Sequence, residues 1–192
     1  MRRYIICLLT LVFIISLAVA KGLCSEPSAG EATEKVSSDK KKAELVWYKY
    51  DEGLAKAEKE KKHLMVHFYT NWCGWCKKMD KGTFSDEEII KVLNESYVPI
   101  KINGQSGEMV MVDGKEISER QVAGEYGVRA YPITWFLKPS GERIAPRRGY
   151  VGAEEFLYIL NWVKDDLYEK TSFQEFVKQQ QEKQETEKKE NN

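Results

Sequence analysis

The pattern of apolar and polar residues predicts alternating strands and helices between residues 45 and 166. Short, continuous apolar runs are typical of strands buried on both faces of a sheet. Apolar residues that recur at helical spacing predict amphipathic helices between those strands. The predicted strands are residues 64–69, 97–102 and 133–137, with an antiparallel partner from residue 143, and the predicted helices are residues 51–62, 74–81, 85–94, 118–126 and 153–166. This order predicts an α/β fold with a mixed central sheet flanked by helices.

Short polar motifs mark several of the predicted ends. Asp51 is the expected cap of the first helix, and the Ser-Asp-Glu-Glu sequence at residues 85–88 predicts a capping box for the third. A turn at residues 139–142 joins the last two strands. Residues 103–116 leave two interpretations open, which are a small hairpin built on residues 109–112 and an irregular loop.

The first twenty residues have the organisation of a secretory signal peptide. Two arginines at positions 2 and 3 precede an apolar stretch that ends in the Ala-Val-Ala sequence of residues 18–20, a small-residue cleavage site. The stretch is about fifteen residues long, short of the ~20 that a membrane-spanning helix needs, so a retained anchor is the less favoured alternative. Lipid attachment at Cys24 is disfavoured because residues 21–23 do not resemble a lipobox.

Composition divides the remaining chain into one folded domain and two polar ends. Residues 21–42 contain almost no large apolar side chains, which predicts a disordered tether. The folded domain is expected over residues 43–168, and residues 169–192 form an extension with one predicted helix, residues 171–183, and a charged end. The 30 basic and 30 acidic residues balance, and loss of the first twenty residues leaves a net charge of about −2. This balance disfavours nucleic acid or an acidic membrane surface as a partner.

The clearest sign of a reactive site in the sequence is a Cys-x-x-Cys pair. Cys73 and Cys76, in the sequence Trp-Cys-Gly-Trp-Cys of residues 72–76, follow the strand of residues 64–69 and open the next predicted helix. A strand, a short turn and a helix that begins at such a pair are typical of a dithiol redox site. At the helix N-terminus the thiolate of Cys73 faces unpaired backbone N–H groups, which lower the thiol pKa. Cys76 lies one turn further on, where it can close or resolve a disulfide.

Two other roles for the cysteine pair are weaker. Structural zinc needs four ligands, but the chain has no second Cys-x-x-Cys pair, and its only histidines are His63 and His67. A purely structural disulfide would close a two-residue loop, which constrains little of the unfolded chain and so stabilises weakly. We therefore expect a redox site without a bound metal, and Cys24 remains as an odd cysteine beside the pair.

Several motifs together resemble those of secreted thioredoxin-fold proteins. The shared residues are Trp72-Cys73-x-x-Cys76-Lys77, Thr83-Phe84-Ser85-Asp86, Val128-x-x-x-Pro132 and the turn that contains Gly141, over about residues 45–163. The likeness is greatest to the C-terminal thioredoxin-like domain of DsbD-type transmembrane electron-transfer proteins and to periplasmic thioredoxin-related proteins. The resemblance implies a thioredoxin fold, an α/β architecture with a mixed central sheet flanked by helices.

The resemblance also implies roles for the residues around the cysteines. Cys73 would attack a partner disulfide, and Cys76 would resolve the mixed disulfide. Pro132 would be the cis-proline next to the pair, with a trans turn proline as the alternative. Tyr131 departs from the small or β-branched residue usual before that proline. Together with Trp72 and Trp75 it would form an apolar rim for a partner polypeptide, in which Trp72 is expected to be largely core and Trp75 exposed.

His67 and Lys101 are the candidates for proton transfer. Thioredoxins usually place a buried Asp six residues before the first cysteine, and this chain has His67 there, with Lys101 matching the lysine that accompanies the Asp. A neutral histidine with a pKa near physiological pH would serve as a base for the resolving thiol. The alternative is a core histidine whose hydrogen bonds are satisfied and which has no redox role.

The predicted function is that of an exported thiol:disulfide oxidoreductase, periplasmic or otherwise extracytoplasmic, that reduces disulfides in protein partners. Electrons would come from a membrane donor, and the Cys73–Cys76 pair would need no further cofactor. A disulfide oxidase or isomerase is one alternative, because loss of a carboxylate at position 67 stabilises the reduced form. A non-catalytic binding module that uses the C-terminal extension is the other.

Overall fold

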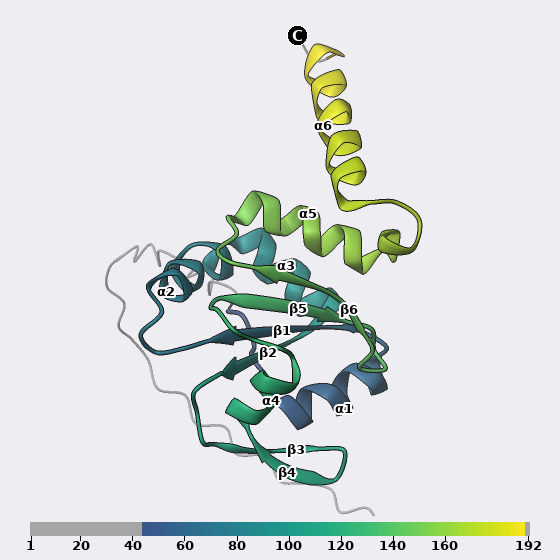
Figure 1. Cartoon of the computed structure of the whole chain (residues 1–192). Helices are drawn as coiled ribbons and strands as arrows, with labels where there is room; N and C mark the ends of the chain where they lie inside the picture. Colours follow the sequence, from purple (N-terminus) through teal and green to yellow (C-terminus); the bar gives the residue numbers. More distant parts are fainter. Residues whose placement is uncertain (1–43, 191–192) are drawn as a thin grey trace, which may run out of the picture. The chain divides into compact units, whose positions relative to one another are not determined.

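A mixed four-stranded sheet forms the centre of the protein. The computed structural model describes residues 44–190, so the predicted signal peptide, the predicted tether and Cys24 lie outside the described residues. The strand order is β2 (Tyr97–Asn103), β1 (His63–Tyr69), β5 (Ile133–Leu137) and β6 (Arg143–Arg148) (Figure 1). β1 runs parallel to β2 and antiparallel to β5, which pairs antiparallel with β6. The predicted α/β arrangement and all four predicted strands are confirmed.

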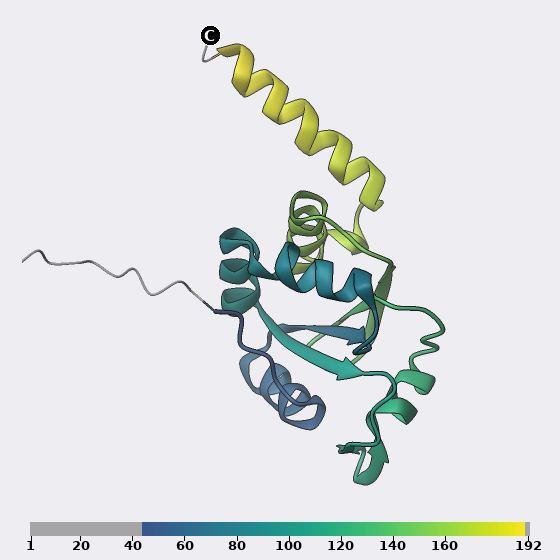
Figure 2. The same cartoon turned by 90° about the vertical axis from the view of Figure 1, so that its left-hand side faces the viewer.

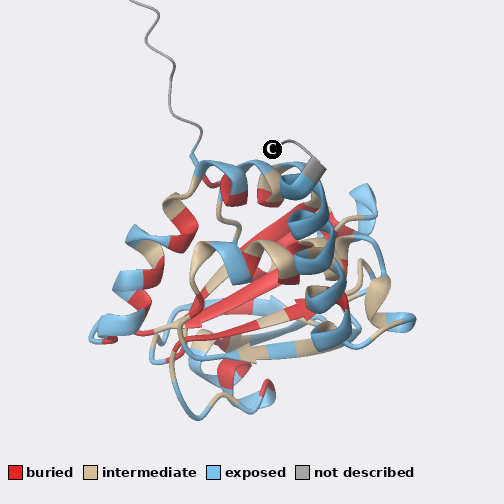
Figure 3. Cartoon of the chain, turned by 90° about the horizontal axis from the view of Figure 1, so that it is seen from above, coloured by how far each residue is buried: buried red, intermediate tan, exposed pale blue. Residues whose placement is uncertain are grey.

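Helices cover both faces of this sheet, and each face has its own apolar cluster. α1 (Tyr50–Glu60) and α4 (Glu119–Glu125) pack on one face, while α2 (Gly74–Lys81), α3 (Glu87–Ser96) and α5 (Ala153–Lys164) pack on the other. Figure 2 shows α1 and the helices α3 and α5 on opposite sides of the strands. Buried residues concentrate along the strands and on the inward helix faces (Figure 3). Burial of such apolar surface is the main source of folding free energy.

β1 contributes side chains to both clusters because successive side chains of a strand point to opposite faces. Leu64, Val66 and Phe68 belong to the cluster under α1 and α4, whereas Met65 belongs to the cluster under α2, α3 and α5. The same alternation places His67 on the face that α2 covers.

Residues 109–118 form a hairpin, which is one of the two interpretations that the sequence left open. β3 (Met109–Val112) pairs antiparallel with β4 (Lys115–Ser118), apart from the central sheet. The connecting residues Asp113 and Gly114 both have positive φ, 50° and 76°, which suits a tight two-residue hairpin turn.

Two predicted helix ends are wrong in detail. α1 begins at Tyr50, and the residue before it makes no side-chain cap, so Asp51 lies in the first turn and does not cap it. α3 is capped by Asp86, whose Oδ1 accepts hydrogen bonds from the N–H groups of Glu88 and Ile89. A Ser at 85 and an Asp at 86 are equally good caps, so the motif alone did not distinguish them.

The C-terminal extension is more helical than predicted. After a short 3-10 helix (Leu167–Glu169), α6 spans Phe173–Glu190. Its first turns contact α5, since Phe176 is buried and the ring of Phe173 lies 5.6 Å from that of Trp162. Among the described helices, none has the length and apolar character that crossing a membrane requires.

Candidate active site

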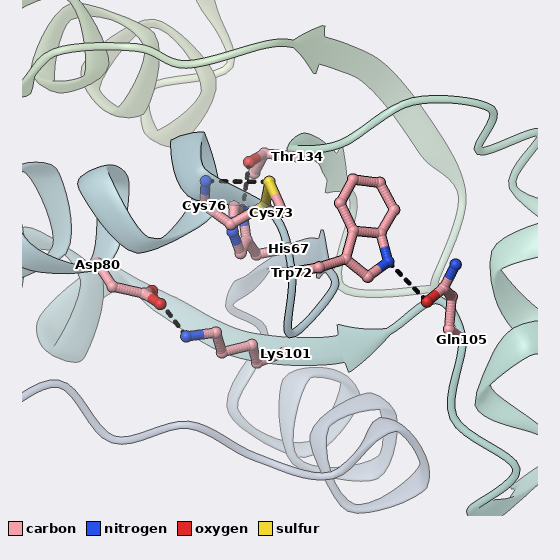
Figure 4. The surroundings of a disulfide bond; sticks show 8 residues. All are labelled: His67, Trp72, Cys73, Cys76, Asp80, Lys101, Gln105 and Thr134. Atoms are coloured by element: carbon pink, nitrogen blue, oxygen red, sulfur yellow. Dashed lines mark hydrogen bonds and ion pairs between the residues drawn. A yellow bond between two sulfur atoms is a disulfide. The ribbon is translucent and has the colours of Figure 1, made fainter.

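Cys73 and Cys76 form a disulfide at the beginning of α2. Cys73 is the N-cap residue of this helix, and its Sγ accepts a hydrogen bond from the backbone N–H of Cys76 at 3.1 Å (Figure 4). The sulfur therefore occupies the position where helix N–H groups lack intrahelical partners. A thiolate formed there on reduction is stabilised by that donor and by the positive end of the helix dipole. Both cysteines are almost fully buried, so a partner must approach through the residues around them.

The peptide bond between Tyr131 and Pro132 is cis, which confirms the predicted geometry of this proline. The backbone N–H of Gly149, after β6, donates to the Pro132 carbonyl at 2.8 Å and holds the loop against the sheet. The ring of Tyr131 meets that of Trp72 edge to face at 6.1 Å. The cis-proline loop and the turn that carries Cys73 are therefore in contact.

Trp72 lies at the surface, so the expectation that it belongs to the core is wrong. Its side chain is 66% exposed. Its indole Nε1 donates to Oε1 of Gln105 at 2.7 Å (Figure 4). The chain leaves the sheet after Tyr69, and residue 72 stands in the turn that follows. Gln105 was missed by the sequence argument, although β1 and β2 are parallel and their following loops must lie at one edge of the sheet.

Trp75 is exposed as predicted, at 57%, and has two partners that the sequence argument missed. Its ring lies 5.5 Å from that of Tyr150. The ammonium group of Lys78 lies over both rings, 4.9 Å from the centroid of Trp75 and 4.8 Å from that of Tyr150. Such cation–π contacts hold a lysine against an aromatic surface without neutralising its charge.

His67 is fully buried and holds one hydrogen bond. Its Nδ1 lies 2.9 Å from Oγ1 of Thr134, its neighbour on β5, while Nε2 has no hydrogen-bond partner among the described residues. Burial and, to a lesser extent, the positive charge of Lys101 lower the pKa of His67 to about 3. The expectation of a pKa near physiological pH is therefore wrong, because the imidazole is held away from water. It is neutral at pH 7, and its role as a base stays a prediction.

Lys101 stands beside His67 on β2, but its ion-pair partner comes from α2. Its Nζ lies 2.6 Å from Oδ1 of Asp80, one helical turn beyond Cys76 (Figure 4). The ammonium group also lies over the rings of Trp47 and Tyr69. Lys101 was found through the resemblance to thioredoxin-fold proteins. Asp80 was missed, because an ion pair between a strand and a helix depends on tertiary packing.

These residues together provide a nucleophile, a resolving thiol and a surface for a partner. Cys73 is stabilised as a thiolate by the helix start, and the exposed indoles of Trp72 and Trp75 flank the pair. No group of three or more potential metal-ligating side chains occurs in the described part of the chain. The position of the two cysteine sulfurs at the beginning of α2 suits chemistry at sulfur.

A family model described as a thioredoxin-like domain matches residues 50–164, more than half of the chain. The chain belongs to the thioredoxin-like family. The thioredoxin fold that the motifs predicted is confirmed, and the match includes Cys73, Cys76 and Pro132. Membership together with the cysteine pair makes this thioredoxin-like domain a thiol:disulfide oxidoreductase domain.

Individual relatives agree with this family. The protein disulfide-isomerase of Oryctolagus cuniculus is 35% identical over 103 residues, which cover 54% of this chain and 18% of the rabbit protein. The solution structure of a disulphide-isomerase candidate from Bacteroides thetaiotaomicron is 30% identical, with a TM-score of 0.50, and the match covers 68% of this chain and 97% of that one. A thioredoxin from Thermus thermophilus is 26% identical, with a TM-score of 0.52, over 62% and 86% of the two chains. This chain spans less than a fifth of the length of the curated protein disulfide-isomerases that it matches.

Proposed function

We propose that this protein is an exported thiol:disulfide oxidoreductase that reduces disulfides in protein partners. The observation that carries the proposal is the position of the Cys73 sulfur, which caps α2 between two exposed indoles and next to a loop with a cis-proline. A small-molecule disulfide would need no such surface. Exposed aromatic side chains around a buried reactive atom suit a polypeptide partner.

The reaction proceeds in two exchanges. In the reduced protein, the Cys73 thiolate attacks one sulfur of the partner disulfide, forms a mixed disulfide and expels the other partner sulfur as a thiolate. Cys76 then loses its proton and attacks the Cys73 sulfur, which forms the Cys73–Cys76 disulfide and releases the second partner thiolate. Two electrons pass from the dithiol to the partner, and a donor, for which we propose a membrane protein, must reduce the pair again.

His67 is suited to the second exchange. That step needs a base for the buried thiol of Cys76, and His67 is neutral, lies on the sheet face that α2 covers and has an Nε2 atom with no partner among the described residues. With a pKa of about 3 the imidazole is a weak base, so it can take the proton only as an ion pair with the Cys76 thiolate, whose negative charge favours the imidazolium.

Oxidation or isomerisation of partner disulfides is a second candidate, and the same residue favours it. A buried carboxylate at position 67 would oppose a nearby thiolate, whereas neutral His67 does not, so the reduced form is more stable and the couple is more oxidising. Two of the proteins compared above also carry the name disulfide-isomerase. The reduction potential distinguishes the two candidates.

Cysteine variants of the full chain test the proposed exchange. Reduction of insulin by dithiothreitol in the presence of Cys73→Ser should fall to the uncatalysed rate, because the nucleophile is absent. Cys76→Ser should accumulate a mixed disulfide with its partner, visible as a slower band on a non-reducing gel. Cys24→Ser is the matched control and should retain the wild-type rate. A Cys73→Ser variant that remained active would contradict the assignment of the nucleophile.

Export is proposed from the N-terminal sequence, which lies outside the described residues. Cleavage after Ala20 predicts a mature protein that begins at Lys21. Expression of the full chain in a bacterial host, fractionation and mass spectrometry of the purified protein would test this step. Recovery of the uncleaved chain from the membrane fraction would instead support the retained anchor.

A further inference from the structure

Three exposed lysines, Lys77, Lys78 and Lys81, follow the cysteine pair along α2. No carboxylate lies within ion-pair distance of any of them in the part of the chain that the structure describes. Lys78 is held over the rings of Trp75 and Tyr150. We call these three lysines the lysine face.

An open pocket of about 500 Å³ lies along the lysine face. It begins at Gly74, which follows Cys73 and is the first residue of α2, and Tyr150 forms part of its wall. The pocket is lined by Gly74, Lys77, Lys78, Lys81, Gly82 and Tyr150. A partner chain that reaches Cys73 across Trp75 would therefore pass directly over uncompensated positive charge.

Carboxylates are scarce in the segments that border the disulfide. Between residues 72 and 82 the only acidic residue is Asp80, and Lys101 neutralises it at 2.6 Å. Between residues 126 and 150 the only one is Glu142, which pairs with Lys138 in the turn between β5 and β6. The whole chain has equal numbers of acidic and basic residues, so this local excess of positive charge is a departure from its composition.

Two arginines extend the positive charge toward the cis-proline. Arg129 precedes Pro132 by three residues, and Arg148 is followed by Gly149, whose N–H donates to the Pro132 carbonyl. Both arginines are exposed, and neither has an ion-pair partner among the residues that the structure describes. The opposite flank of the disulfide, formed by Trp72 and its partners, is neutral.

From this arrangement we propose that the site selects polypeptide disulfides flanked by acidic residues. The acidic residues of the partner lie along the lysine face while a sulfur of the partner disulfide reaches Cys73. The proposal rests on the proposed function and specifies its substrate class. Complementary charge acts mainly by raising the rate of encounter and by fixing the orientation of the partner, and it weakens as salt increases.

Three disulfide-linked peptide dimers form the probe. They are identical except for two Glu, two Gln or two Lys residues beside the cysteine. The fully reduced full chain is mixed with each dimer, and the rate constant of disulfide reduction is measured by stopped flow. At about 20 mM NaCl the Glu peptide should react about tenfold faster than the Lys peptide, and about 0.5 M NaCl should remove most of this difference.

The double variant K77E/K81E tests the lysine face while it leaves Lys78 on its two aromatic rings. Its matched control is K59E/K91E, which changes the net charge equally at exposed lysines of α1 and α3. The intrinsic reactivity of each peptide cancels when the two variants are compared. The ratio of Glu-peptide to Lys-peptide rates should fall about fivefold or more in K77E/K81E and stay within about twofold of wild type in the control.

The outcomes separate this proposal from the one it rests on. Equal ratios in the two double variants, with the Gln peptide still reduced by wild type, would overturn the acidic preference and leave the exchange activity standing. Failure of all three peptides to react with the reduced wild-type chain would refute the exchange activity itself, and the preference with it.

Discussion

His67 is a fully buried titratable residue on the central strand β1. It stands between Lys101 and Thr134, its register neighbours on the two adjacent strands, so the three side chains form a row on the sheet face beneath α2. Burial removes the imidazole from water, and the nearby ammonium group of Lys101 further disfavours its protonation. The position that would otherwise hold a negative charge next to the cysteines is therefore neutral.

This burial predicts that acid destabilises the protein through His67. The pKa is about 3 in the folded chain, and that of an unfolded histidine is about 6.5. Between those values the unfolded chain binds a proton that the folded chain does not, so stability is full above about pH 6.5 and is lost as the pH falls. The free energy of unfolding, measured by urea titration, should decrease by about 2 kcal/mol from pH 8 to pH 5.

The variant His67→Asn should remove most of that pH dependence, whatever its stability at pH 8, because its side chain does not titrate. The matched control is His63→Asn, since His63 is the only other histidine. Burial also lowers the pKa of His63, but Asp166, at 3.2 Å from its Nε2, opposes the shift. The His63→Asn variant should therefore keep the larger part of the pH dependence of the free energy of unfolding. An unchanged pH dependence in His67→Asn would refute its assignment to His67.

At this scale spacing along the chain identified Cys73 and Cys76, and the resemblance to thioredoxin-fold proteins pointed to Pro132 and His67. The sequence could not show that Asp80 reaches Lys101 from α2, because that ion pair depends on how the helix lies against the strand. It also failed for Trp72, whose exposure depends on the exact residue at which β1 ends. Spacing predicts which residues are neighbours along an element, whereas contacts between elements require the packed fold.

Among the elements, α3 shows how a single side chain fixes a helix start. Asp86 accepts two backbone hydrogen bonds there, whereas within the described residues Asp51 in α1 accepts only from the adjacent Glu52 N–H. We expect Asp86→Ala to lower the free energy of unfolding by about 1 kcal/mol. Asp51→Ala is the control and should change it by less than about 0.5 kcal/mol. Equal losses in urea titrations of the two variants would show that Asp86 is not the effective cap.

α6 is expected to contribute to stability through its first turns, because the hydrogen bond from its later part, from Gln184 Nε2 to the Tyr158 hydroxyl at 3.1 Å, is exposed to water. Phe176 is buried against the domain, while residues 181–189 are exposed. Deletion of residues 179–192 should leave both the free energy of unfolding and the insulin reduction rate unchanged within error. In the shortened chain, Phe176→Ala should lower the free energy of unfolding by about 3 kcal/mol, because it leaves a cavity where Phe176 packs against the domain.

The same deletion tests the binding-module alternative. A cut at Lys170 would remove Phe173 and Phe176 and so would combine a loss of packing with any loss of function. A cut after Lys178 avoids this confusion. If the shorter chain lost its exchange activity while it kept its stability, the extension would have a functional role that the proposed mechanism does not include.

Hydrophobic periodicity located β1, β2 and β5, since buried strands must be apolar over their whole length, whereas the turn at residues 139–142 located β6, which is partly exposed and carries three arginines. It was less successful at the ends of elements, where neighbouring polar residues such as Ser85 and Asp86 serve equally well as caps. The helix beyond residue 183 was also missed. Its Gln, Lys and Glu residues have good helix propensity, but they bury no apolar face that a periodic pattern could reveal.

For the molecule as a whole, the direction of electron flow depends on the balance between reduced and oxidised states. The helix start stabilises the Cys73 thiolate, and the neutral His67 adds no negative charge that would oppose it. Stabilisation of the thiolate raises the potential of the couple. The structure therefore contains contributions that favour oxidation of partners, within a domain for which we propose reduction.

The reduction potential of the Cys73–Cys76 couple, measured by equilibration with glutathione or dithiothreitol buffers at pH 7, decides between these directions. The proposed reductase requires a value near the −270 mV of thioredoxin, and a value between about −180 and −120 mV would replace it with the isomerase or oxidase. In either case His67→Asp should make the potential more negative by about 30 mV or more, because a buried carboxylate opposes the thiolate and ~30 mV corresponds to ~1.4 kcal/mol. His63→Asp, at the opposite end of β1, is the control and should leave the potential unchanged within about 10 mV. A potential that did not respond to His67→Asp would show that position 67 does not influence the couple.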